Sequence, residues 1–272
     1  MKTQQRNILK HIVLGSIIIG SLLHGAPSTP TAENKPVING NIAELLNIAG
    51  KQRMLSQRIA KDYLYMGKKV AVDKASKQLE KSLSTFKKSQ TYLDKAIIDP
   101  EIKNLIAFVN MSQNELEATA KKPFSLDNAQ LILDLSESML EGSQYIVDSL
   151  KSTAKASGSV IVAIAGKQRM LAQRIAKYYI AYQSGIKDKN TVEQMKSTVK
   201  LFDENNKRLI NNASNTAQIS QRLKKISMLW KIVYKFYLNI EKGGLPFIVF
   251  TSTDDIAKKM DQVTELYTQS NL

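Results

Sequence analysis

A segment of thirteen residues occurs twice in this chain with a single difference. It reads AGKQRMLSQRIAK from Ala49 to Lys61 and AGKQRMLAQRIAK from Ala165 to Lys177. Other positions at the same spacing of 116 residues also agree, such as Phe86 and Phe202. A repeat at a fixed spacing indicates two copies of one structural unit, here of about 115 residues, rather than one large domain.

The sequence between its turn signals has the spacing of amphipathic helices. Asp99 followed by Pro100 is typical of a helix start, and Ser125 and Thr253 with Asp254 are further candidate N-caps. Helices are predicted over residues 38–70, 72–97, 100–121 and 126–157, and again over 158–186, 189–212, 216–242 and 253–270. The predicted fold class is therefore all-α, with two tandem four-helix-bundle units. In one version of this prediction, the fourth and fifth helices join as one continuous long helix.

The first residues have the pattern of a secretory signal peptide. Lys2, Arg6 and Lys10 precede an apolar run from Ile12 to Leu23, which is too short for a comfortable membrane span. We expect a signal peptide at 1–26, a linker at 27–37, a first unit at 38–157 and a second unit at 158–272. This organisation predicts a periplasmic protein. The alternative is an uncleaved leader that serves as an N-terminal anchor and provides the one contact with the membrane.

The composition excludes several kinds of site. The chain has no cysteine, and His11 and His24 both lie in or beside the leader. A mature chain without His and Cys lacks the ligands of most metal sites and the groups of Ser-His and Cys-His catalysis. We therefore expect no enzyme activity, no metal and no cofactor. The net charge of +15 indicates a solvated lysine-rich surface, or attraction to anions or acidic lipid headgroups, but not nucleic-acid binding in an exported protein.

The repeated segment has an arginine at the centre of a narrow helical stripe. At 100° per residue, the stripe in the first copy contains mainly small and apolar side chains: Ile42, Leu46, Ala49, Arg53, Ser56, Ala60 and Leu64. The second copy repeats it with Arg169, whereas Lys51, Arg58 and Lys61 point elsewhere, towards water or another partner. The stripe holds no carboxylate.

An arginine on a close-packed helix face needs a partner, because burying an unpaired charge costs several kcal/mol. One interpretation is an internal carboxylate from elsewhere in the chain. The other is an exogenous anion between two helices packed stripe to stripe, where Arg53 and Arg169 would otherwise repel each other. A planar, singly charged and weakly hydrated oxyanion such as nitrate suits the planar fork of arginine.

The extended segments, NIAGKQRMLSQRIAK and AIAGKQRMLAQRIAK, resemble the opening motif of the type IV pilus chemotaxis transducer N-terminal domain, the PilJ-like domain. They are similar, more distantly, to the NarX-type nitrate sensor domain. The resemblance implies periplasmic four-helix bundles that pair through their first helices, several of which bind nitrate or nitrite there. By match to the motif, Arg53 and Arg169 would contact the anion, and Gly50 and Gly166 would permit close approach. The supporting positions are Ala49, Ser56, Ala165, Ala172, Arg58 and Arg174, although helix phase favours a structural role for the last two.

The expected function is that of an exported sensory module for a small oxyanion, nitrate or nitrite. No signalling module follows the second repeat in this sequence, so we expect output through a separate protein partner. The alternative is a helical interaction protein of the envelope, or of a pilus or chemosensory system, that binds no ligand. The pattern leaves open whether the first helices pair within one chain or between chains.

Overall fold

Eight α-helices make up most of the part of the chain that this computed structural model describes, residues 38–39, 41–153 and 160–269. Their bounds are α2 (Ile42–Gly67), α3 (Val72–Ala96), α4 (Pro100–Ala120), α5 (Leu126–Thr153), α6 (Val160–Gln183), α7 (Lys189–Ile210), α8 (Ala217–Leu238) and α9 (Pro246–Gln269), with a short 3-10 helix at Ile240–Lys242. The all-α prediction is confirmed. Within these residues, β pairing is limited to an isolated bridge between Ile38 and Ile97.

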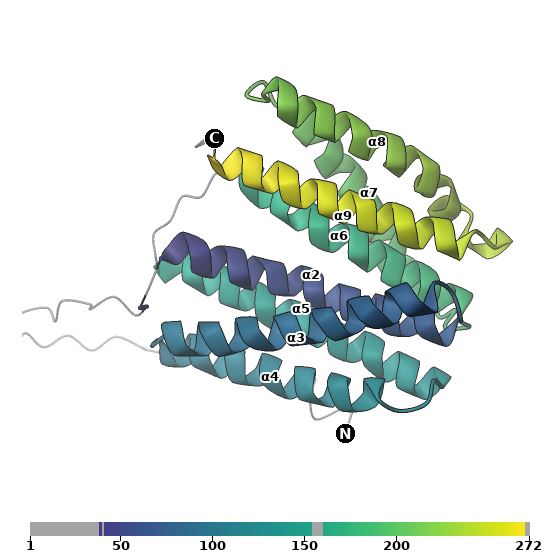
Figure 1. Ribbon diagram of the computed structural model, residues 1–272, viewed down its shortest axis with the longest axis horizontal. Coiled ribbons are helices and arrows are strands. Elements are labelled where there is room, and N and C mark those ends of the chain that lie inside the picture. The colour runs from purple at the N-terminus through teal and green to yellow at the C-terminus, as the bar shows by residue number, and fades with distance from the viewer. Residues whose placement is uncertain (1–37, 40, 154–159, 270–272) are drawn as a thin grey trace, which may run out of the picture. The chain divides into compact units, whose positions relative to one another are not determined.

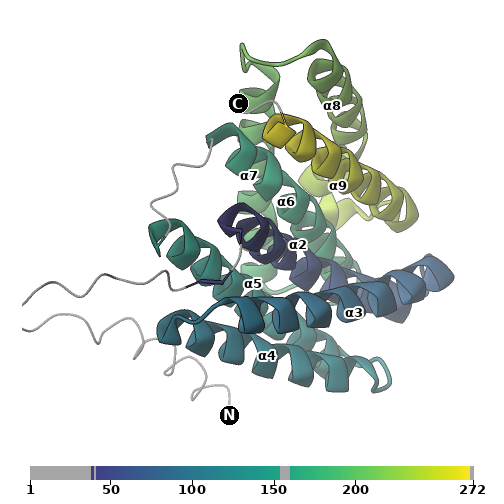
Figure 2. The same cartoon turned by 60° about the vertical axis from the view of Figure 1, so that its left-hand side comes forward.

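The helices form two antiparallel groups of four that meet along α2 and α6. Helix α2 packs on α3 and α5, and α4 packs on α5; in the second group, α6 packs on α7 and α9, and α8 packs on α9. Helices α2 and α6 also pack against each other, and both views show them at the centre of the arrangement (Figures 1 and 2). The first helices of the two repeats are thus paired within a single chain.

Helix starts follow the predicted signals in the first group. The Asp99 carboxylate accepts a hydrogen bond of 2.9 Å from the Ile102 amide, and Pro100 occupies the first turn, where its missing N–H costs nothing. Ser125 Oγ accepts a hydrogen bond of 3.1 Å from the Asn128 amide. These two residues confirm that the capping pattern sets where α4 and α5 begin.

The predicted start of the last helix is wrong. Helix α9 begins at Pro246, seven residues before Thr253, and the Leu245 carbonyl already accepts a 3.1 Å hydrogen bond from the Val249 amide. Thr253 Oγ1 does not cap the helix; it donates to the Val249 carbonyl at 2.6 Å. The helix extends because Val249 and Phe250 are completely buried, and their burial outweighs the turn signal of the preceding Gly-Gly pair.

The repeat extends from the core to the turns. Phe86 of α3 and Phe202 of α7 are both completely buried. Lys69 and Gly185, also 116 residues apart, both have a positive φ, of 59° and 109°, in the turn after the first helix of each group. The predicted signal peptide at 1–26, the linker at 27–37 and the junction between the units at 157–158, with its continuous helix, fall on residues outside the described part of the chain.

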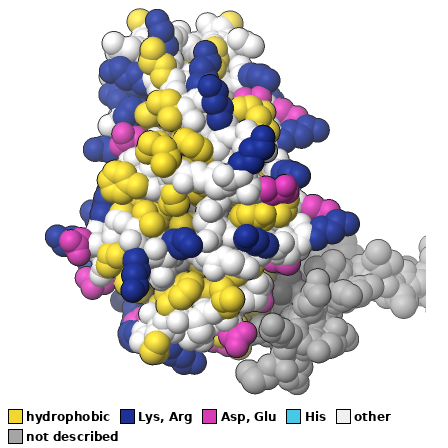
Figure 3. Space-filling model, turned by 90° about the vertical axis from the view of Figure 1, so that its right-hand side faces the viewer, with side chains coloured by type: hydrophobic (Ala, Val, Ile, Leu, Met, Phe, Trp, Pro, Cys, Tyr) yellow, Lys and Arg dark blue, Asp and Glu magenta, His cyan; other side chains and the backbone are white. Residues whose placement is uncertain are grey.

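None of the helices in the described ranges is long and apolar enough to cross a membrane. The end of the molecule where the α2–α3 and α8–α9 turns lie carries many dark blue Lys and Arg side chains, interspersed with hydrophobic patches (Figure 3). Exposed apolar side chains at or next to helix starts include Val72 of α3, Leu126 of α5, and Leu245 and Phe247 at the start of α9.

Candidate functional site

The pairing of α2 with α6 places both copies of the repeated segment at the centre of the molecule. Their small residues are fully or almost fully buried: Ala49, Ser56, Ala165 and Ala172. Ser56 Oγ is within hydrogen-bonding distance, 2.9 Å, of the Arg53 carbonyl. Small buried side chains allow two helices to approach closely, so the polar groups among them lie in a region of low water content.

Arg53 has an amide, not a carboxylate, as its side-chain partner. Its Nη1 donates to Gln144 Oε1 of α5 at 2.5 Å, and Gln144 in turn donates to Asp148 at 2.8 Å. In the described part of the chain, Arg53 forms no ion pair within 4 Å. Burial and the nearby charge of Arg169 lower the pKa of Arg53 to about 10, and Asp148 only partly offsets them. Arg53 is therefore a cation whose charge is poorly compensated.

Arg169 has the carboxylate that Arg53 lacks. Its Nη1 donates to Asp261 of α9 in an ion pair, and its Nε donates to the Gly166 carbonyl at 3.3 Å. The Arg169 side chain is 7% exposed and that of Asp261 is 52% exposed. The internal-carboxylate interpretation therefore describes Arg169 but not Arg53.

The glycine three residues before each arginine leaves space beside the guanidinium. A Cβ added at Gly50 would lie 3.4 Å from Arg53 Nη2, and one at Gly166 would lie 3.5 Å from Arg169 Nη2. A side chain at either position would contact Nη2, so the two glycines leave this edge of each guanidinium without a neighbouring Cβ.

Arg58 and Arg174 match in sequence but differ in their contacts. Arg174 donates to both carboxylate oxygens of Glu137, at 3.3 and 2.5 Å, and to Gln194 Oε1 at 3.0 Å. This bidentate pair fits the predicted structural role. Arg58 Nε is buried without a hydrogen-bond partner among the described residues, so Arg58 has no comparable bidentate pair there.

Two lysines of the repeated segment connect the helical groups, which the sequence analysis missed. Lys61 was expected to point towards water or a partner, yet it is completely buried, and its Nζ donates to Asp254 of α9 at 2.6 Å. Lys177 is equally buried and donates to Glu137 of α5 at 2.5 Å. Each first helix thus binds the last helix of the other group. Both lysines are the last residue of the repeated segment, and this shared position was the one sign in the sequence that they have a common role.

The carboxylates at these contacts have shifted pKa values. Burial alone would raise the pKa of Glu137, but the adjacent Lys177 and Arg174 together bring it down to about 2. Burial raises the pKa of Asp62 to about 7, and the nearby Asp254 contributes in the same direction, although Lys61 opposes them. Lys61 Nζ lies 3.2 Å from Asp62 Oδ1, but neither Asp62 oxygen has a hydrogen-bond partner in the described ranges.

Comparison with protein families assigns this architecture. The family model described as the type IV pili methyl-accepting chemotaxis transducer N-terminal domain matches residues 38–103 and 151–242, which together exceed half of the chain. Each matched stretch contains one copy of the repeated segment. The chain belongs to the PilJ family. Its two matched stretches correspond to a tandem PilJ-like domain, and the family is one of sensory domains of chemotaxis transducers.

The PilJ assignment rests on the family model and on the repeated segment. Neither the comparison with curated proteins nor the comparison with solved structures found a significant match. The first PilJ match covers α2 and α3, and the second covers α6 to α8. Both first helices, with Arg53 and Arg169, therefore lie inside the matched residues.

Proposed function

We propose that this PilJ protein is a sensory module that binds a small planar oxyanion, nitrate or nitrite, between α2 and α6. The observation that carries the proposal is Arg53: it is partly buried, it lies close enough to Arg169 for its pKa to fall, and its side-chain partner is the neutral Gln144. An anion beside it would offset both burial and repulsion, which otherwise cost free energy in the folded state.

The accessible edge of the Arg53 guanidinium is where the anion would bind. Nη1 and Nε of Arg53 already donate to Gln144 and to the Gly50 carbonyl, whereas Nη2 borders the space that Gly50 leaves. A planar oxyanion accepts hydrogen bonds in the plane of such a fork, and nitrate loses its hydration more readily than sulfate or phosphate.

Arg169 would complete the site from α6. Its partner Asp261 is 52% exposed and can turn towards water, while the anion would take its place beside the Arg169 side chain, which is 7% exposed and needs a negatively charged partner. An anion would then bridge Arg53 and Arg169 and replace their repulsion with attraction. This bridging would favour a closer packing of α2 on α6.

The output would pass through the last helix of each group. Lys61 of α2 is bound to Asp254 of α9, and Lys177 of α6 is bound to Glu137 of α5. A movement of α2 relative to α6 therefore displaces α5 and α9, which a separate protein partner would read. We place the mature protein in the periplasm, after export directed by residues 1–26, without a cofactor and without nucleic acid.

Thermal unfolding with and without anions tests the proposal. At a hundred times its dissociation constant, a ligand adds about 2.7 kcal/mol to stability, worth roughly 5 °C in a chain of this size, at about 2 °C per kcal/mol. We expect this shift with nitrate or nitrite but not with chloride or sulfate. Arg53→Gln removes the shift, whereas Lys88→Gln, at an exposed position of α3, keeps it.

One observation favours a second candidate function, that of an interaction protein without a ligand. The ion pair between Arg169 and Asp261 shows how the same motif can be satisfied internally. Under this alternative, no anion changes the unfolding temperature, and wild type and Arg53→Gln respond identically to every salt.

A further inference from the structure

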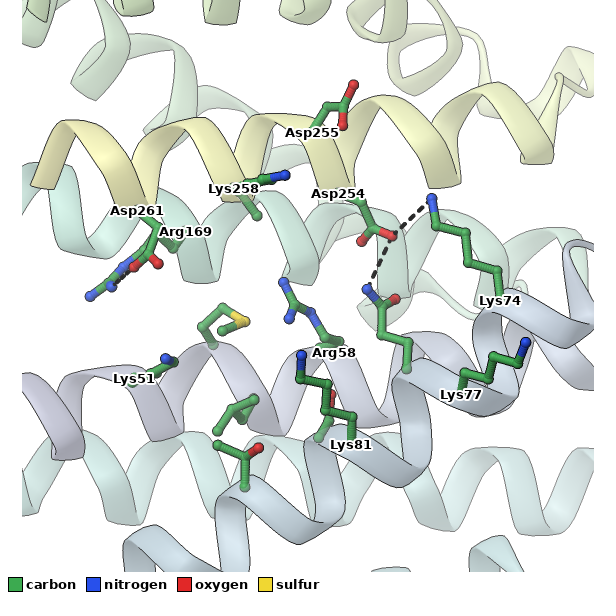
Figure 4. Close-up of a pocket in the computed structure, with 16 residues that line it drawn as sticks. Lys51, Arg58, Lys74, Lys77, Lys81, Arg169, Asp254, Asp255, Lys258 and Asp261 are labelled. Atoms are coloured by element: carbon green, nitrogen blue, oxygen red, sulfur yellow. Dashed lines mark hydrogen bonds and ion pairs between the residues drawn. The ribbon is translucent and has the colours of Figure 1, made fainter. Parts of the chain in front are cut away.

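A second cationic feature lies outside the α2–α6 contact. A cleft of about 590 Å³ is bounded by α2, α3 and α9, and Arg58 and Lys81 extend into it from its lower wall (Figure 4). Its volume is in the range of small-molecule sites. Apart from Arg169 at its edge, the cleft is lined by six cationic side chains: Lys51, Arg58, Lys74, Lys77, Lys81 and Lys258.

The carboxylates of the cleft do not neutralise these cations. Asp254 binds the buried Lys61 and lies 3.8 Å from Lys74, and Asp261 is paired with Arg169. Asp255 is the third carboxylate of the lining. In the described residues, no carboxylate lies within 4 Å of the amines of four of the lysines: Lys51, Lys77, Lys81 and Lys258. Arg58 Nε is buried without a hydrogen bond there. The cleft therefore holds an excess of positive charge.

The other repeat provides an internal comparison, because equivalent positions lie 116 residues apart on α3 and α7. The residues on α7 equivalent to the three α3 lysines of the cleft are neutral or acidic: Asn190, Glu193 and Ser197. On the last helices, where Gln144 is equivalent to Asp261, Glu141 is equivalent to Lys258. Arg174 is bound by Glu137, whereas Arg58 has no such pair. The lysines that α3 and α9 contribute are thus not a by-product of the shared motif or of the shared fold.

The cationic side chains of the cleft are spread along the helices and are not gathered around one position. Lys74, Lys77 and Lys81 lie along one side of α3, and a span of seven residues corresponds to about 10 Å of helix. Lys51 and Arg58 are also seven residues apart on α2. One nitrate-sized ion does not bridge such rows. A linear anion with several charged groups does, and lysine suits phosphate because it acts as a point charge with freely rotating donors.

We propose that this cleft binds a small soluble anion made of linked phosphate groups. Lys77, Lys81 and Lys258 would hold it from α3 and α9, with Arg58 donating from the floor of the cleft. Helices α3 and α9 belong to different helical groups, so the anion would also fasten the two groups together. This site adjoins the proposed nitrate site at Arg169, but it extends along α3 and α9 and differs in the number of charges that it compensates.

Isothermal titration calorimetry of the full chain with inorganic tripolyphosphate tests the proposal. The triple variant Lys77→Glu/Lys81→Ser/Lys258→Glu copies residues that the other repeat carries at the equivalent positions. The matched control is Lys87→Glu/Lys88→Ser/Lys225→Glu, which makes the same change in charge at exposed positions outside the cleft. Circular dichroism tests whether both variants fold. If the triple variant does not fold, the single variant Lys81→Ala replaces it.

We expect the cleft variant to weaken tripolyphosphate binding by about tenfold or more, equivalent to about 1.4 kcal/mol. The control should stay within about twofold of wild type. Equal losses in the two variants would overturn the proposal, because they would indicate non-specific attraction to a basic protein. Absence of binding to wild type would overturn it as well, and so would citrate binding as tightly as tripolyphosphate. Arg53→Gln, which tests the nitrate site, should leave tripolyphosphate binding intact.

Discussion

Gln144 and Asp261 accept hydrogen bonds from the Nη1 atoms of two equivalent arginines, but only Asp261 does so with a negative charge. The two repeats therefore treat the same arginine differently: Arg169 is neutralised within the chain, and Arg53 is not. The electrostatic cost of the α2–α6 contact therefore falls mainly on Arg53.

Gln144→Glu should stabilise the protein in the absence of nitrate and remove its response to nitrate. The new carboxylate would pair with Arg53 as Asp261 pairs with Arg169, a charge-assisted hydrogen bond worth about 1.5–3 kcal/mol. Part of this gain is offset by repulsion from Asp148, to which the Gln144 amide donates at 2.8 Å in the wild type. Urea unfolding in chloride measures the gain, and thermal unfolding with nitrate measures the response. Asp148→Asn is the companion variant, because it removes the carboxylate behind Gln144 and should lower stability. A full nitrate response in Gln144→Glu would contradict the assignment of Arg53.

Gly50→Ala should make the protein more stable and yet less responsive. Alanine is favoured over glycine inside a helix by up to about 1 kcal/mol, and its Cβ would make only ordinary contact, 3.4 Å from Arg53 Nη2. The same methyl group would occupy the space in which the anion binds. We expect a higher unfolding temperature and a nitrate shift at most half that of wild type. If the stabilised variant responds fully, the anion does not bind beside Nη2.

Glu137→Gln should be strongly destabilising near neutral pH, by about 3–5 kcal/mol, because it leaves the buried Lys177 without its carboxylate. The pKa of Glu137 is about 2 in the folded protein, compared with 4.5 in the unfolded chain. Its contribution is therefore complete above pH 4.5 and is lost as the pH falls towards 2.

Urea unfolding of wild type and Glu137→Gln across this range measures the linkage. The difference between them should shrink on acidification, whereas the exposed control Glu80→Gln should change stability by less than about 0.5 kcal/mol at any pH. A difference that is constant from pH 5 to pH 2 would show that Glu137 is not held in its charged form.

Asp62→Asn should show the opposite pH dependence. Burial raises the pKa of Asp62 from 3.8 to about 7, so the folded state binds this proton more tightly than the unfolded state does. The stability that the protonated carboxyl contributes is complete below pH 3.8 and is lost as the pH rises through 7. The variant should therefore gain on wild type between pH 4 and pH 8, by about 4 kcal/mol, which follows from the difference between pKa values of 3.8 and about 7. Parallel stability curves for the two proteins would exclude this linkage.

The sequence predicted the elements of the fold better than their contacts. Helical periodicity and local caps such as Asp99 located most helices, because both signals depend on neighbours within one turn. The start of α9 was missed because the burial of Val249 and Phe250, a tertiary effect, decides it. The repeat identified Arg53 and Arg169, but their partners come from helices about 90 residues away in the chain.

Long-range contacts also explain what was missed at the candidate sites. Helix phase predicts the direction in which Lys61 points, but not the residue that it meets in that direction. That residue is Asp254, which lies 193 residues further along the chain. The cationic cleft is assembled from α2, α3 and α9, which belong to both repeats. The composition gives the net positive charge of the chain, but it does not predict where on the surface the lysines and arginines cluster.

The coupling free energy between Arg53 and Arg169 tests the central claim most directly. A double-mutant cycle of Arg53→Gln and Arg169→Gln, measured by urea unfolding in chloride and again in saturating nitrate, isolates this term. We predict an unfavourable coupling in chloride, from repulsion, that becomes favourable in nitrate, with a change of about 2.7 kcal/mol at a hundred times the dissociation constant. The same coupling in both salts would contradict an anion bridge between the two arginines.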